Sequence, residues 1–203
     1  MEIFWNTIAR YNAATWPWQI AIVAAAAVLT VLLYLRPTQN VKRAMKLFLA
    51  GLNAWIAVVY YLVWCGQRSH SDVLALFWGI MAVIWLYDLY ADFTRFERTS
   101  RPNGFALLLY LMPLAYPLFS LARGLSFPMM TMPVMPCSVA VFTIGLMLAF
   151  SERVNIVLAM FLCHWALIGL SKVYFFGIPE DYLLACSTIP ALYIFFREYV
   201  RSN

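Results

Sequence analysis

Long apolar runs separated by short polar stretches dominate the chain. Several runs approach the ~20 residues that a helix needs to cross the core of a bilayer. No polar stretch between them exceeds about fifteen residues. The pattern predicts an all-α polytopic membrane protein, a seven-transmembrane-helix bundle that forms one transmembrane domain over 1–203. The expected spans are 16–35, 44–64, 73–90, 104–122, 136–150, 154–171 and 182–196.

Composition supports the membrane class. The 203 residues are 65% hydrophobic and 11% charged, whereas a soluble domain has roughly a quarter of its residues charged. The net charge of +5 lies in short loops, where membrane topology explains it better than nucleic acid does. The lipid bilayer is therefore the expected partner, with no nucleic acid.

Basic residues are distributed unevenly between alternate loops. Ten of the 14 Lys and Arg residues fall in 36–46, 91–103, 151–153 and 197–203. Because cytoplasmic loops carry the excess of positive charge, the N-terminus is expected outside and the C-terminus inside. No cleaved signal peptide is expected, since the first apolar run lacks a preceding basic region and a cleavage site.

Three local features add expectations. Residues 1–15 mix apolar and polar positions, which fits either a short interfacial helix or a loose terminus. Asn53, in the second span, is expected to bond across a helix contact. Asp88, near the end of the third span, is expected to pair with Arg95.

The segment before the fifth span differs from the rest of the chain. Residues 127–137, FPMMTMPVMPC, contain three prolines and four methionines. Each proline lacks an N–H and disfavours helix in the residue before it, so 127–136 is not expected to be a continuous helix. A span that begins at Pro136 and ends at Phe150 is roughly 22 Å long, short of the ~30 Å core. Either the preceding turn dips into the bundle or the bilayer thins locally, and the dip is the favoured expectation.

A broken helix of this kind suggests a solute or ion path. Helix ends inside transporters often face substrate, and ionisable groups within spans are functional candidates. Each residue also has an ordinary reading as a snorkelling side chain, a helix start or a structural hydrogen bond. The candidates are Arg123, Cys137, His164, Lys172, Glu180 and Asp181.

Sulfur-bearing side chains in the same segment raise a second hypothesis. Thioethers and thiolates suit Cu(I), although methionine also fills irregular gaps in packing. The candidate ligands are Met129, Met130, Met132, Met135 and Cys137. Cys65 and Cys137 are both expected on the outer side, where a disulfide between them would persist.

Several enzyme and pigment classes lack their residues here. The last span has no lysine for retinal, His164 is the one histidine expected inside a span, and no paired intramembrane aspartates or P-loop are present. These features favour a protein that is not an enzyme and needs no cofactor other than the copper of the second hypothesis.

Five phrases of the sequence are similar to those of a known family. They are Phe4–Ile8, Tyr11–Trp16, Leu121–Pro128, Val134–Cys137 and Phe176–Asp181. Over nearly its whole length the chain resembles an uncharacterised bacterial family of small multi-pass membrane proteins, a domain of unknown function. The resemblance implies a multi-pass protein of the bacterial inner (plasma) membrane and brings no activity, cofactor or catalytic residue.

Three functions remain open at this point. The first is a small-solute or ion transporter or channel with its site behind the proline-broken fifth helix. The second is a membrane-embedded soft-metal (copper) or thiol redox protein. The third is a non-catalytic membrane component of a complex, and a homo-oligomer is compatible with each.

Overall fold

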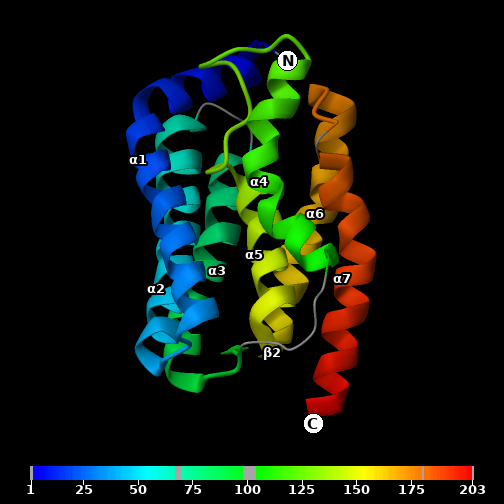
Figure 1. Cartoon of the computed structure of the whole chain (residues 1–203). Helices are drawn as coiled ribbons and strands as arrows, with labels where there is room; N and C mark the ends of the chain where they lie inside the picture. The colour runs from blue at the N-terminus through cyan, green and yellow to red at the C-terminus, as the bar shows by residue number, and fades with distance from the viewer. Residues whose placement is uncertain (1, 67–69, 98–103, 180, 203) are drawn as a thin grey trace.

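The protein is a bundle of membrane-length helices (Figure 1). A computed structural model describes residues 2–66, 70–97, 104–179 and 181–202. Its helices are α1 (Glu2–Leu35), α2 (Gln39–Trp55), the π-helix η1 (Ile56–Trp64), α3 (Ser71–Ala91), α4 (Gly104–Ala122), α5 (Pro136–Phe150), α6 (Ile156–Phe176) and α7 (Asp181–Ser202). The short strands β1 (Arg95–Phe96) and β2 (Ser151–Arg153) form one antiparallel ladder.

The all-α membrane class is confirmed. Among the described residues, five helical segments are long and apolar enough to cross a bilayer: Glu2–Leu35, Gln39–Trp64, Ser71–Ala91, Gly104–Ala122 and Ile156–Phe175. Pro136–Phe150 and Leu184–Arg197 are apolar but shorter. A multi-pass protein follows from these lengths, while the count of seven spans stays a prediction.

The two ends of the bundle differ in their loops. The N-terminus lies at one end and the C-terminus at the other, and successive helices run up and down between them (Figure 1). At the end that holds the C-terminus, Arg95 pairs with Arg153 across the ladder. We call this end the basic end and the opposite one the N-terminal end.

α5 is the central helix. Every residue from Pro136 to Leu148 is buried, and its closest neighbour is α4. A Cβ added to Gly145 would lie 2.4 Å from the backbone nitrogen of Tyr110, so only glycine permits this approach of the two helices. An all-round apolar helix is the kind that a bundle buries.

The structure decides between the two interpretations of residues 1–15, which were a helix and a loose terminus. It is one helix from Glu2, with Pro17 inside it, and its first turns lie across the N-terminal end before it descends along the bundle (Figure 1). Proline removes a backbone donor and kinks a helix. The helix therefore starts fourteen residues before the expected span at Trp16.

α2 also differs from expectation. It starts at Gln39, where Thr38 Oγ1 accepts from Val41 N, and continues as nine residues of π-helix. Asn53 does not bond across a helix contact. Its Nδ2 donates to the carbonyl of Leu49 in its own helix, 2.7 Å away, so the expected interhelical bond was wrong.

A buried ion pair joins α2 to α3 at the basic end. Lys46 Nζ lies 3.0 Å from Asp88 Oδ2 and 2.7 Å from Asp92 Oδ1. The side chains of Lys46 and Asp88 are 3% and 1% exposed. Asp88 also accepts from the backbone N–H groups of Phe93 and Thr94. The expected pair of Asp88 with Arg95 was wrong, because Arg95 contacts Asp92, at 3.6 Å.

Asp92 is the exposed member of this cluster. Partial burial opposes its ionisation, but the hydrogen bond and charge of Lys46, with the charges of Arg95 and Lys42, outweigh that effect. The pKa of Asp92 is therefore lowered from its ordinary value.

Replacing Lys46 by methionine tests the buried pair. Lys46→Met leaves the Asp88 carboxylate buried without its cation, which costs about 3–5 kcal/mol. We expect a large fall in the thermal midpoint of helix loss in detergent. Lys42→Met is the matched control, because Lys42 bonds the half-exposed Glu97 at 2.5 Å and an exposed pair contributes about 0–1 kcal/mol. Equal shifts for both variants would contradict a special role for Lys46.

Cysteine labelling tests the orientation. In a Cys186→Ser background, which removes the one exposed native thiol among the described cysteines, Gln39→Cys probes the basic end and Ser126→Cys the N-terminal end. Both positions are exposed. Since the basic loops are expected in the cytoplasm, an impermeant maleimide should label Ser126→Cys but not Gln39→Cys in intact cells. The reverse pattern would invert the orientation.

Candidate functional site

The candidate site lies where the broken segment 126–135 meets four helices at the N-terminal end. The chain leaves α4, crosses that end and descends into the bundle before α5 begins (Figure 1). Met130, Val134 and Met135 are buried, and α5 starts at Pro136. Both the break in the helix and the dip into the bundle are confirmed.

Two side chains of α1 hold the backbone of the broken segment. Tyr11 donates its hydroxyl to the carbonyl of Val134 over 2.6 Å. Asn12 donates its amide to the carbonyls of Pro128 and Met130, each over 2.8 Å. Because the segment lacks helical hydrogen bonds, these side chains supply donors that its own backbone does not.

α4 holds the same segment from the other side. The hydroxyls of Ser120 and Thr131 are 2.6 Å apart, Thr131 N donates to Ser120 Oγ over 3.1 Å, and Thr131 Oγ1 donates to the carbonyl of Tyr116 over 3.1 Å. Ser138, in the first turn of α5, donates to the carbonyl of Met132 over 3.0 Å. Protein groups within the bundle thus bond several backbone groups of the broken segment.

A carboxylate lies directly beside this polar network. Asp181, in the first turn of α7, is 1% exposed. Cys137 donates its thiol to Asp181 Oδ2 over 3.0 Å, and Tyr116 donates its hydroxyl to Oδ1 over 3.2 Å. The Cβ position of Gly169 in α6 is 3.8 Å from Oδ2. The carboxylate therefore lies where α4, α5, α6 and α7 meet.

Arg123 lies at the surface and joins the loop that follows α4 to the C-terminal end of α6. Its guanidinium donates to the carbonyl of Gly177, which ends α6 in the left-handed region at φ 64°. Gly124 has φ 80°, a conformation that glycine adopts without strain. The sequence prediction that Arg123 lies at the same end as Cys137 agrees with this geometry.

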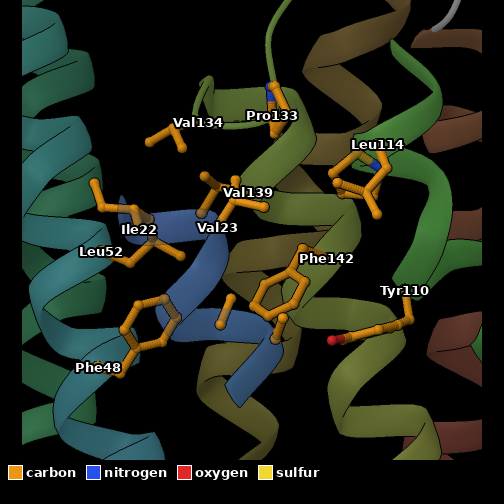
Figure 2. A pocket seen from close by; sticks show the side chains of 13 residues that line it. Ile22, Val23, Phe48, Leu52, Tyr110, Leu114, Pro133, Val134, Val139 and Phe142 are labelled. Atoms are coloured by element: carbon orange, nitrogen blue, oxygen red, sulfur yellow. The ribbon is translucent and has the colours of Figure 1, made fainter. Parts of the chain in front are cut away.

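An apolar cleft lies below the broken segment, between α1, α2, α4 and α5. Figure 2 shows Pro133 and Val134 at its upper edge, across from Ile22 of α1. It holds about 510 Å³ of unfilled space, counted out to its open mouth. Side chains such as Val139 and Phe142 line it, and the Tyr110 hydroxyl is its polar group (Figure 2). This cleft is therefore apolar, and none of the described candidate residues for a solute or ion path lines it.

The remaining predicted residues fall in different places. His164 is exposed on α6 and its ring centroid lies 6.1 Å from that of Phe77, so it faces outward rather than toward Asp181. Lys172 belongs to α6, and its side chain lies outside what the structure describes. Glu180 lies outside the described residues. The structure thus brings together Cys137 and Asp181, with Arg123 nearby in the loops.

The methionines of the segment differ in burial. Met130 and Met135 are buried, while Met129 is 39% exposed. The sulfur of Met135 accepts from Met132 N over 3.2 Å. No group of three or more His, Cys, Asp or Glu side chains able to hold a metal occurs among the described residues. A methionine site for copper stays a prediction.

The cysteines are reduced in this structure. Cys65, Cys137 and Cys163 are free and buried, and Cys186 is free and exposed. The disulfide considered between Cys65 and Cys137 is therefore not formed here, and the thiol of Cys137 is used on Asp181 instead.

Sequence reasoning missed the α1 side of the site. Asn12, Thr15 and Gln19 are all buried, and Gln19 Nε2 bonds both Thr15 and Asn12. Their spacing of three and four residues was a signal for one polar helix face. The signal was missed because residues 1–15 were analysed separately from the span expected to begin at Trp16.

The chain belongs to a family of unknown function (DUF6064), whose model matches residues 1–203. No curated protein and no solved structure matches it. Family membership therefore brings no activity, and the multi-pass membrane class comes from the long apolar helices.

Replacing Asn12 tests the contact between α1 and the broken segment. Asn12→Leu keeps the side-chain size but removes the donors to two buried carbonyls, at about 1–3 kcal/mol for each. We expect a lower thermal midpoint in detergent and faster proteolysis within 126–135. Asn6→Leu, at an exposed position of the same helix, is the control. If both variants behave like the unmodified protein, Asn12 does not hold the segment.

Proposed function

We propose that the protein moves a small solute or ion across the membrane, and that Asp181, Cys137 and Tyr116 line its binding site at the start of α5. The observation that carries this proposal is the Asp181 carboxylate, 1% exposed within an apolar bundle and bonded to a thiol and a phenol. Arg123 would lie at the mouth of the path.

The energetic cost of burying a carboxylate supports a functional role for Asp181. A buried carboxylate is expensive to maintain, and ionisable groups inside membrane bundles usually mark substrate or ion pathways. An asparagine or serine could begin α7 without that cost, because both are good N-terminal capping residues. A carboxylate at this position is chemically suited to bind a cation or a proton.

The broken segment supports the same function. Irregular backbone at membrane depth occurs where it lines a site or is buried in protein, and broken helices place substrate sites near the middle of many transporters. Here the break directly precedes Cys137, which bonds Asp181. Movement of the segment would change the surroundings of the carboxylate, which is what alternating access requires.

The chemistry of the site favours a cationic or proton-coupled substrate. The donors on Asp181 include the hydroxyl of Tyr116 and the thiol of Cys137, groups that a cation can displace by rotation of the side chains. His164, which faces outward, is not part of this site. Lys172 and Glu180 remain expected at the same end.

Proteoliposome currents test the proposal. Purified protein on a solid-supported membrane is exposed to jumps in pH and in panels of inorganic cations and small amines. Asp181→Asn keeps the shape and removes the charge. Because hydrogen bonds to a charged group contribute about 1.5–3 kcal/mol, we expect currents to require about tenfold more substrate, or to vanish.

Asp72→Asn is the matched control, since Asp72 is an exposed acid in the first turn of α3. It should leave the currents unchanged. Currents that are equal for Asp181→Asn and the unmodified protein, or no current with any solute in the panel, would overturn the proposal.

A further inference from the structure

A second cleft opens at the basic end, between α3 and α6. It holds about 770 Å³ of unfilled space, counted out to its open mouth. Its lining combines one cation with aromatic and aliphatic groups: Arg153, Tyr87, Phe93, Ile84, Ile156 and Val157. The rings of Tyr87 and Phe93 lie side by side, with centroids 6.2 Å apart. Tyr87 is 61% exposed, so this aromatic pair forms part of the rim.

Two arginines are ladder partners beside this cleft, and one of them, Arg153, lines it. Arg95 and Arg153 are opposite one another in the β1–β2 ladder, next to a register irregularity between Arg95 and Phe96. Like charges at opposite positions of a ladder are destabilising. The Arg95 contact with Asp92, at 3.6 Å, is longer than a hydrogen bond. None of the acidic side chains that the structure describes lies within ion-pair distance of Arg153.

Neighbouring polar groups are already in use. Asn155 Oδ1 accepts from the N–H groups of Val157 and Leu158, over 3.0 and 3.3 Å, and so caps its own helix. Asp92 is bonded to Lys46 at 2.7 Å. An anion placed between the two guanidinium groups would relieve their repulsion without displacing these contacts.

The apolar wall of the cleft covers about one turn of each helix. Ile84 and Tyr87 of α3 line it together with Ile156 and Val157 of α6, and three residues of helix rise about 5 Å. Further along the bundle, the ring centroids of Phe77 in α3 and Phe161 in α6 are 5.0 Å apart.

We propose that this cleft binds an anionic phospholipid, with the headgroup phosphate between Arg95 and Arg153 and an acyl chain along Ile84 and Val157. The paired cations require an anion, and the apolar wall behind them requires a hydrocarbon chain. A free phosphate would use only the first feature. The excess of basic residues at this end matches the anionic lipids of a cytoplasmic leaflet.

Native mass spectrometry of the full-length protein in detergent tests the site. Phosphatidylglycerol, phosphatidylcholine and inorganic phosphate are titrated separately. A basic residue near a membrane surface strengthens binding of anionic lipid by about fivefold. Arg153→Gln should therefore raise the apparent Kd for phosphatidylglycerol about fivefold, and Arg95→Gln with Arg153→Gln about 25-fold. Arg153→Lys should restore much of the loss.

Two further variants separate the lipid from other ligands. Val157→Trp fills the cleft and should weaken phosphatidylglycerol binding as much as the double arginine variant does. Leu167→Trp, at an equally exposed position further along α6, should not. Arg36→Gln, at an exposed position of the basic end, should have little effect. Each variant is first required to keep the helix content of the unmodified protein.

Three outcomes would overturn the proposal. They are equal binding of phosphatidylcholine, unchanged phosphatidylglycerol binding in Val157→Trp, and an arginine effect seen with inorganic phosphate alone. A dimer that excludes lipid and disappears in Val157→Trp would assign the cleft to a second copy of the chain. None of these results depends on whether Asp181 carries a solute.

Discussion

The rest of this structure depends on satisfying a stretch of non-helical backbone inside an apolar bundle. Water cannot reach hydrocarbon, so each carbonyl there needs a protein donor. Asn12 and Tyr11 donate to three carbonyls between Pro128 and Val134. This requirement explains why α1 begins long before its membrane-crossing part, and why its first turns lie across the end of the bundle (Figure 1). α1 therefore holds the broken segment in place in addition to forming a membrane-length helix.

The sequence predicted what local chemistry determines. Prolines at 128, 133 and 136 fix the break, so the start of α5 at Pro136 and its end at Phe150 agree with the structure. Asp181 was a candidate as an acid beside the start of the last span, and Cys137 as a sulfur-bearing residue at the start of the fifth. Partners across long separations were not predictable. Tyr11 and Val134 are 123 positions apart, and nothing in either neighbourhood indicates the other. Lys46 was likewise counted as a loop cation, although it is buried against Asp88.

The wrong predictions share a physical cause. Asn53 and Asp88 were each assigned a partner from position along the sequence, but the partner depends on which way a helix face points. His164 is exposed, whereas Cys163 and Trp165 beside it are buried. Apolar side chains surround every membrane helix, so hydropathy marks the span without marking its inner face. Lipid tails and the protein core are both apolar, so the sequence does not indicate which face of each helix points into the bundle.

The two polar regions use different donors. At the basic end, Asp88 is bonded to the Lys46 ammonium and to backbone N–H groups, and this cluster joins α2 to the segment that follows α3. Removing Lys46 would leave a buried charge uncompensated. At the N-terminal end, the donors to Asp181 include a thiol and a hydroxyl, which lie on side chains that can rotate about their own bonds. Rotation of these two side chains would open part of the carboxylate to a ligand without moving a helix, which is the physical reason for seeking ligand exchange at the start of α5.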